Sequence, residues 1–342
     1  MYPLFRSFLF RLDPETAHGL TLRLIHLAGI LPPVRGVLRL AFAAPSRPVP
    51  AFGLTFANPL GLAAGYDKDG LGWRGLATLG FGHIELGTVT PRPQDGNPKP
   101  RLFRLIDERA VINRMGFPGR GAEFVARQLR SPRPQGLVLG VNLGKNKDTP
   151  LEDAARDYMS LLQTFAPLAD YLAINVSSPN TEGLRRLQAR DALQELLSAL
   201  AEQRRLEVQR LGRPVPLLVK LAPDLTDAEL DDALDALLST GMDGAIATNT
   251  TLGRDGLHTP LAAEAGGLSG APLRSLSTDM VRKIAARTQG RLPVIGVGGA
   301  ASAQDVREKL EAGACLVQLY TALIYEGPGL VKKILCEQPT GN

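Results

Sequence analysis

The chain has 342 residues, of which 44% are hydrophobic and 21% are charged, a balance typical of globular proteins. Its net charge of +5 is small and its Lys and Arg residues are scattered, so no nucleic-acid partner is predicted. The two cysteines, Cys315 and Cys336, stand outside any Cys/His cluster, which excludes a disulfide scaffold and a structural metal site and fits a reducing compartment. No uninterrupted apolar run reaches the roughly 18 residues of a membrane-spanning helix.

Residues 1–42 predict two short, basic, amphipathic helices ahead of the main domain. Asp13 has the features of a helix N-cap and Pro14 those of a first helical residue. Such helices either dock on the main domain as a cap or lie in a membrane interface, with Phe and Leu inserted among the lipids. The Pro-rich residues that follow predict a linker and entry segment over 43–57.

Short apolar runs alternate with helical patterns over residues 58–338. Eight runs are predicted as strands: 59–64, 82–88, 137–143, 171–176, 216–221, 244–248, 293–297 and 315–320. Helices are predicted over 151–165, 190–211, 226–240, 272–288, 302–312 and 328–336. Continuous apolar strands indicate a parallel sheet buried on both faces. We therefore predict an α/β fold, a (β/α)8 TIM barrel with an N-terminal two-helix extension. A doubly wound sheet is the alternative, and it is disfavoured because no GxGxxG follows the first strand.

Nearly every predicted strand ends in an amide, a hydroxyl, a lysine or a glycine. The richest of these ends is the segment 175–181, which offers two amides and three hydroxyls directly after a buried strand. An ordinary capped turn is the alternative for this segment alone. Because active sites of barrel enzymes lie at the carboxyl ends of the strands, the eight ends together predict one polar ligand pocket.

Two features of the pocket favour a phosphate-bearing cofactor. Gly298 and Gly299 precede a helix beginning near Ser302, at the usual phosphate position of a barrel, and a loop over 267–270 could add donors. A tight glycine turn is the alternative. Lys220 ends the fifth strand in the barrel mouth, where it needs an anion unless its side chain extends to the surface. Flavin mononucleotide (FMN) carries a phosphate and becomes negatively charged on reduction, so it suits both features.

With these residues assembled, the chain closely resembles the class 2, quinone-dependent dihydroorotate dehydrogenases over essentially its whole length. The resembling motifs are Gly61–Gly70 (GLAAGYDKDG), Glu85–Pro91 (ELGTVTP), Asn113–Phe117 (NRMGF) and Asn175–Thr181 (NVSSPNT). Tyr66 is a small departure, because an apolar residue without a hydroxyl is more usual there. The resemblance implies FMN as cofactor and the oxidation of dihydroorotate to orotate in pyrimidine synthesis, with electrons passing to a membrane quinone.

Site residues follow from the same resemblance, position by position. FMN would be held by Ala64, Gly65, Tyr66, Asp67, Lys68, Thr88, Asn142, Asn175, Lys220, Thr248, Gly270, Gly299, Tyr320 and Thr321. The substrate would be held by Lys68, Asn113, Arg114, Met115, Gly116, Phe117, Asn175, Asn180, Asn249 and Thr250. This set suits a cyclic imide with a carboxylate, because lysine pairs with the carboxylate and asparagines both donate and accept.

Ser178 falls on the catalytic base of the family. It would take the proton from C5 of dihydroorotate while C6 gives a hydride to the flavin. A serine needs help to act as a base, and we expect Thr181 to relay the proton through water. Lys220 would stabilise charge on the reduced flavin. The related class 1 enzymes use a cysteine base and lack the N-terminal extension, and neither cysteine of this chain falls near the corresponding loop.

The extension is accordingly interpreted as an apolar entry for a quinone tail, with peripheral membrane contact through residues 1–42 at the cytoplasmic face of the inner membrane. Two alternatives stay open at the level of sequence. One is a soluble-class dehydrogenase that passes electrons to fumarate or NAD. The other is a non-catalytic flavin- or phosphate-binding barrel, against which the intact set of Lys68, Ser178 and Lys220 argues, because binding alone needs no base.

Overall fold

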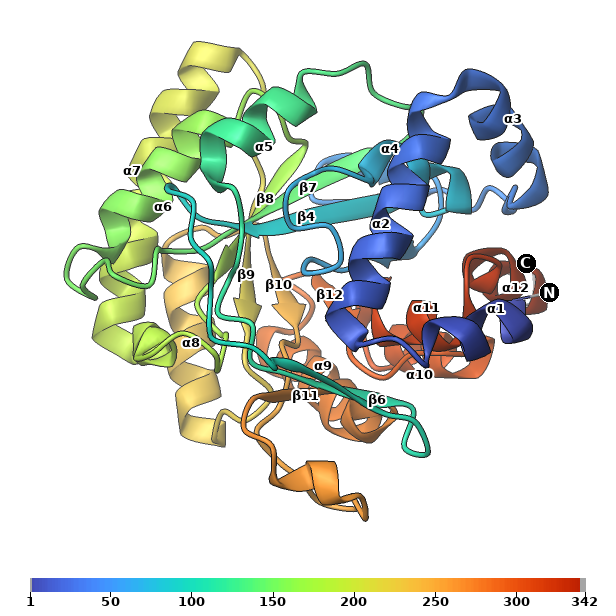
Figure 1. Ribbon diagram of the computed structural model, residues 1–342. Helices are drawn as coiled ribbons and strands as arrows, with labels where there is room; N and C mark the ends of the chain where they lie inside the picture. The colour runs from blue at the N-terminus through green and yellow to red at the C-terminus, as the bar shows by residue number, and fades with distance from the viewer. Residues whose placement is uncertain (1, 339–342) are drawn as a thin grey trace.

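Eight parallel strands close into a barrel in the computed structural model, which describes residues 2–338 (Figure 1). The strands are β3 (Leu60–Leu62), β4 (His83–Val89), β7 (Val138–Leu143), β8 (Tyr171–Asn175), β9 (Leu217–Leu221), β10 (Gly244–Ala247), β12 (Val294–Val297) and β13 (Ala314–Leu319). Each pairs in parallel with its neighbours, and β13 returns to β3 to close the ring. All eight predicted strands and the barrel are confirmed.

Helices surround the barrel. The six predicted helices are confirmed as α6 (Ala154–Phe165), α7 (Arg190–Leu211), α8 (Asp227–Ser239), α9 (Arg274–Thr288), α10 (Ala303–Glu311) and α12 (Leu330–Glu337). The shorter α4 (Trp73–Leu76), α5 (Gly121–Leu129) and α11 (Thr321–Glu326) complete the ring. Almost every strand residue is buried, because helices cover the outer face of the sheet and side chains fill the interior.

Three further strands form a small antiparallel sheet that the sequence did not predict. They are β5 (Leu102–Leu105), β6 (Ala110–Asn113) and β11 (Gly267–Gly270), in the order β11–β6–β5. The segment 267–270, expected to be a loop, is thus a strand paired with β6. The expected linker also contains structure, a hairpin of β1 (Val49–Ala51) and β2 (Leu54–Phe56).

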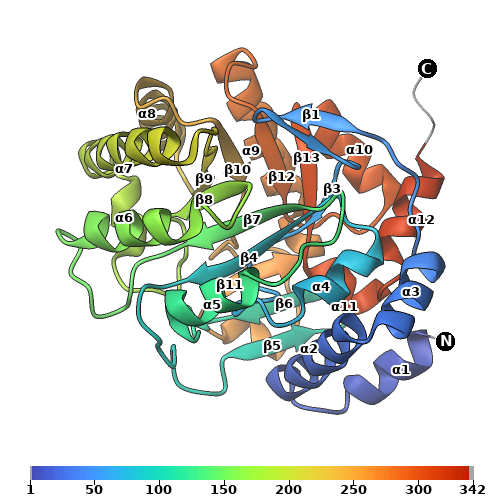
Figure 2. The same cartoon turned by 90° about the horizontal axis from the view of Figure 1, so that it is seen from above.

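The extension contains three helices rather than two. They are α1 (Tyr2–Leu9), α2 (Pro14–Ile30) and α3 (Pro32–Ala41), and they lie together on one side of the barrel, beside α4, α11 and β5 (Figure 2). Asp13 caps α2 as predicted, since its carboxylate accepts a hydrogen bond from the Thr16 N–H at 2.9 Å. Between residues 2 and 338, no single helix is long and apolar enough to cross a membrane, although α2 and α3, bent by 106°, pass that test as a pair.

Candidate active site

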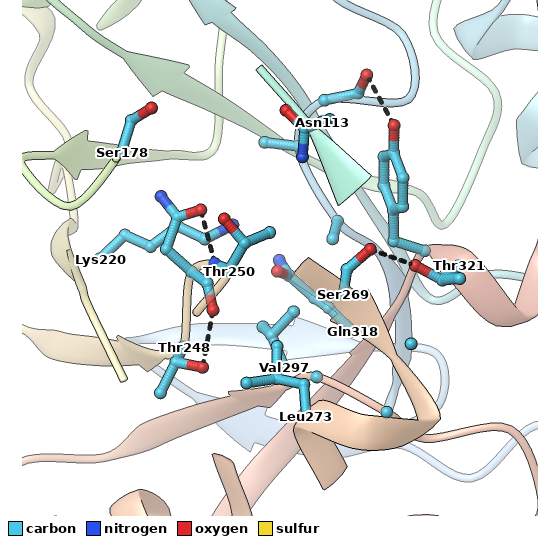
Figure 3. A pocket seen from close by; sticks show the side chains of 18 of the residues that line it. Asn113, Ser178, Lys220, Thr248, Thr250, Ser269, Leu273, Val297, Gln318 and Thr321 are labelled. Carbon is cyan, nitrogen blue, oxygen red and sulfur yellow. Dashed lines mark hydrogen bonds between the residues drawn. The ribbon is translucent and has the colours of Figure 1, made fainter. Parts of the chain in front are cut away.

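A cavity opens at the carboxyl ends of the barrel strands, where the sequence placed the ligand pocket (Figure 3). The structure brings most of the predicted site residues to its lining. These are Ala64, Gly65, Lys68, Thr88, Asn113, Met115, Gly116, Phe117, Asn175, Ser178, Asn180, Lys220, Thr248, Asn249, Thr250, Gly270, Gly299, Tyr320 and Thr321. Ser178 and Lys220 lie on one side of the cavity, and Ser269 and Thr321 lie on the opposite side (Figure 3).

Five predicted site residues do not line this cavity. Asp67 is buried behind it, and its carboxylate accepts the N–H groups that follow in the same turn. Arg114 turns away to form an ion pair with Glu264 at 2.6 Å. The remaining three are buried nearby: Tyr66, Asn142 and Thr181.

Several lining residues were missed by the sequence. They include Arg109, Leu273, Val297, Gln318 and Tyr325, whereas Ser269 belongs to the segment 267–270 that was expected to add donors. That segment is the unpredicted strand β11. Gln318 lies inside β13, before the strand end at which polar residues were sought. A polar residue within an apolar run was the available signal for it, because a buried amide needs a partner.

Glycine backbone and a helix start form one end of the cavity. Gly299 has a φ of +72°, and a Cβ there would lie 2.5 Å from the Arg274 backbone, so only glycine fits. Helix α11 begins at Thr321 without a side-chain cap; the Leu323 N–H donates to the Tyr320 carbonyl, and the N–H groups of Thr321 and Ala322 are left for an anion. The helix near Ser302, α10, was expected to present free N–H groups to a phosphate. Its start is instead capped, because the Asp305 carboxylate already accepts the N–H groups of Ala301 and Ser302.

At the floor of the cavity, two polar groups lack partners among the described residues. No residue accepts a hydrogen bond from the Lys220 ammonium, which burial holds at a lowered pKa, and its nearest opposite charge is Glu85. The Gln318 amide donates to the Glu85 carboxylate at 2.8 Å, and this bond fixes the amide orientation. Its carbonyl oxygen is then left buried without a donor. Such groups are costly unless a ligand satisfies them.

A chain of amides forms one wall. Asn142 lies behind this wall, where its side-chain oxygen accepts from the Thr88 hydroxyl at 2.6 Å and from the Asn175 amide at 3.0 Å. Asn249 in turn donates to the Asn175 side-chain oxygen at 3.2 Å. Every amide in this row is oriented by a neighbour, so the wall presents donors and acceptors at fixed positions.

A second cavity, of about 320 Å³, lies between the extension and the barrel. Its lining is mainly apolar and comes from α1, α2, α3 and the facing barrel elements. The residues include Tyr2, Leu9, Phe10, Ala17, His18, Leu24, Ile25, Leu38, Phe42, Tyr66, Val111, Tyr320, Leu323 and Ile324. Tyr320 lines both cavities, so the apolar space and the more polar one adjoin at this side chain.

Comparison with known proteins decides the family. The sequence model of the dihydroorotate dehydrogenase family matches residues 48–339. A relative described as dihydroorotate dehydrogenase (quinone), from Aeromonas hydrophila subsp. hydrophila, is 51% identical over 339 residues, covering 98% of this chain and 99% of that protein. Another of the same description, from Azotobacter vinelandii, is 51% identical over 334 residues, covering 97% and 95%. The chain belongs to the dihydroorotate dehydrogenase family.

Solved structures agree. The crystal structure of DHODH from Eimeria tenella in complex with ferulenol matches with a TM-score of 0.88 and 39% identity, covering 95% of this chain and 90% of that one. The ligand-free form from the same organism matches with a TM-score of 0.86 and 40% identity, covering 95% and 94%. Both alignments extend well beyond the barrel alone, since each covers 95% of the chain.

Dihydroorotate dehydrogenases are FMN enzymes, and the cavity fits this cofactor. The Gly299 backbone and the uncapped start of α11 suit its phosphate. The unpaired Lys220 ammonium and the Gln318 carbonyl oxygen suit a ring system that carries both acceptors and an N–H donor. These orphaned groups come from the strand ends β9 and β13, so the barrel itself fixes their positions.

Lys68 and Ser178 both line the cavity. Burial lowers the pKa of Lys68 to about 8, while Asp69 and Glu15 oppose the shift, and its ammonium donates to the Gly65 carbonyl at 2.6 Å. Ser178 is 4% exposed, and its hydroxyl oxygen accepts the Asn180 N–H at 3.2 Å. The Asn180 side chain donates to Asn113 at 3.1 Å, which ties the serine loop to the end of β6.

Proposed function

We propose that this protein oxidises dihydroorotate to orotate with bound FMN and passes the electrons to a membrane quinone, in pyrimidine biosynthesis. The observation that carries the proposal is one cavity, at the carboxyl ends of the barrel strands, that contains Lys68, Ser178 and Lys220 together. The relatives described as quinone-type dehydrogenases support the choice of acceptor.

In this proposal the substrate binds between Lys68 and the row of asparagines. The Lys68 ammonium pairs with the carboxylate, because a buried cation gains most from an anionic partner. Asn113, Asn175 and Asn249 address the ring carbonyl and N–H groups from three different strand ends. Their amides are held by the neighbouring side chains, so the ring is bound in one orientation.

Ser178 is the proposed base that takes the C5 proton. Its oxygen is held by the Asn180 N–H, and its own proton has no acceptor among the described residues, so a water must take that proton as the C5 proton arrives. The Thr181 hydroxyl is buried and unpaired close by in the chain, which supports a relay through water. When bound, FMN would supply the acceptor for the C6 hydride and a carrier that passes the two electrons on to the quinone. Lys220 stabilises negative charge as the hydride leaves the substrate.

The apolar cavity is the proposed route for the quinone. It begins among α1, α2 and α3 and ends at Tyr320, which also lines the flavin cavity. Of the fifteen large hydrophobic residues that are exposed in the described chain, eleven lie between Leu4 and Leu40. Such a concentration of apolar surface around a cavity mouth suits peripheral contact with a membrane. We place the protein at the cytoplasmic face of the inner membrane.

The test uses the purified full-length protein. We expect a yellow flavin spectrum that dihydroorotate bleaches without oxygen, followed by return of the colour on addition of decylubiquinone. Return of the colour with fumarate or NAD instead would favour the soluble-class alternative. Absence of bleaching by dihydroorotate would leave only the non-catalytic barrel.

A further inference from the structure

Tyr66 carries a hydroxyl that the apolar cavity leaves without a partner. Four hydroxyl groups belong to residues lining that cavity. Three of them donate to backbone carbonyls: Tyr2 to Ile324, Thr21 to Ala17 and Tyr320 to Gly65. The Tyr66 hydroxyl makes no hydrogen bond to any residue of the described chain, and it is therefore the one free donor among the four.

The ring of Tyr66 is fixed, so this hydroxyl cannot turn to bulk water. Tyr66 is only 6% exposed. Its ring packs edge-to-face against His18, with centroids 5.1 Å apart, and against Tyr320, with centroids 5.9 Å apart. A donor that opens onto a mainly apolar cavity without an acceptor from the chain is suited to a ligand that supplies one.

The position of Tyr66 indicates which end of the cavity the ligand acceptor occupies. Tyr66 directly follows Gly65, which lines the flavin cavity, and it packs on Tyr320, which lines both cavities. Tyr66 therefore stands at the inner end, where electrons leave the flavin. Burial raises the pKa of Tyr66 well above its ordinary value and lowers that of His18 to about 4, so both side chains are neutral.

We propose that Tyr66 donates a hydrogen bond to a carbonyl oxygen of the quinone headgroup at the inner end of the apolar cavity, and so helps determine which acceptor is used. This inference rests on the proposed quinone reductase activity. A phenylalanine or leucine in this place would keep the cavity apolar and remove the donor. The tail of the quinone is recognised by the apolar lining, and the headgroup is recognised by Tyr66.

Tyr66→Phe tests the proposal, because it keeps the ring packing and deletes only the hydroxyl. Steady-state oxidation of dihydroorotate is followed with decylubiquinone and, separately, with ferricyanide, a small ion that does not need the apolar cavity. The KM for decylubiquinone should rise by about three- to tenfold, the usual effect of one hydrogen bond. The ferricyanide rate, the FMN content and the bleaching rate with dihydroorotate should stay at wild-type values.

The outcomes separate this inference from the activity on which it rests. If the wild-type protein does not reduce decylubiquinone, the proposed function fails. If the wild type reduces it and Tyr66→Phe has the same KM for it, the hydrogen bond is refuted while the function stands. An equal loss with both acceptors would also refute it, since that result would place Tyr66 in the structure of the flavin cavity.

Discussion

At the scale of single residues, the groups that the protein leaves unpaired mark where its ligands bind. The Lys220 ammonium and the Gln318 carbonyl oxygen face the flavin cavity, and the Tyr66 hydroxyl faces the apolar one. The Asn142 amide behind the cavity wall is satisfied within the chain, by Thr88, Asn175 and Glu85. Unpaired groups therefore indicate ligand binding only where they line a cavity, since the unpaired ring nitrogens of the buried His83 line neither cavity.

Ser178→Ala should retain FMN and substrate binding but lose most turnover. The side chain is buried in the cavity and caps one backbone N–H, so its loss leaves the fold in place. Removing a general base typically costs about 10²–10⁴ in rate. Anaerobic stopped-flow bleaching of the flavin by dihydroorotate measures this step, and Ser160→Ala, an exposed serine on α6, is the matched control. Bleaching by Ser178→Ala at the wild-type rate would remove the serine from the mechanism.

Lys220→Met should slow flavin reduction more than it weakens flavin binding. The side chain is buried, and its charge has no partner within hydrogen-bonding distance, so its main effect is on developing negative charge. Loss of one such group typically costs about 100-fold in rate. The bleaching rate and the FMN content are measured side by side, with Lys333→Met on the surface of α12 as control. An unchanged reduction rate would exclude this electrostatic role.

The pKa of Lys68 predicts a pH dependence of substrate capture. Because burial lowers this pKa to about 8, the side chain loses its proton as the pH rises through that value. Only the protonated form pairs with a carboxylate, so kcat/KM for dihydroorotate should fall above that pH. In the complex the carboxylate holds the proton on the lysine, and kcat should stay level to higher pH. Lys68→Arg should shift the fall upward, and a flat kcat/KM profile to about pH 10 would contradict the assignment.

At the scale of elements, the sequence predicted the strands and helices whose residues share one environment along their length. The eight barrel strands are buried on both faces and therefore appear as continuous apolar runs. Strands β5 and β11 were missed because they are partly exposed and only four residues long, and they contain Arg104, Ser269 and two glycines. Helix α3 was missed although its apolar residues recur with a clear helical period; it begins at Pro32-Pro33, separated from the end of α2 by only one residue, and it buries no residue.

The same reasoning applies to the site. Residues at strand ends were predictable, because a parallel barrel brings all these ends to one face. The direction in which a side chain points just beyond a strand end could not be predicted. Tyr66 points into the apolar cavity and Arg114 toward Glu264, although their neighbours Gly65 and Met115 line the flavin cavity. The direction of each of these side chains depends on how its loop packs against distant strands. The local sequence does not encode that packing.

The exposed face of the extension should determine membrane affinity. Leu4 on α1 is 81% exposed and Leu40 on α3 is 80% exposed. Replacing both with serine should weaken binding to anionic lipid vesicles by at least about tenfold, given the apolar area removed. Ferricyanide-coupled activity should be unchanged. Leu206→Ser, an exposed leucine on α7, is the control, and equal vesicle binding by both variants would place the membrane contact elsewhere.

At the scale of the whole molecule, two cavities that differ in polarity meet at Tyr320. The polar cavity is built by the barrel ends, and the apolar cavity by the extension packed against them. In the proposed function, substrate and quinone would approach the flavin from different sides of Tyr320, so neither would have to leave before the other enters. This arrangement predicts that the two half-reactions can be separated by a single substitution.

Thr21→Trp should block the quinone half-reaction alone. Thr21 lies on α2 with its side chain at the apolar cavity, and an indole there would fill space that a quinone tail needs. We expect the KM for decylubiquinone to rise at least about tenfold, since overpacking a binding space typically costs more than 1 kcal/mol. Bleaching by dihydroorotate takes place in the other cavity and should keep its rate. Arg23→Trp, on the exposed side of the same helix, is the matched control, and equal quinone kinetics in the two variants would mean that electrons leave by another route.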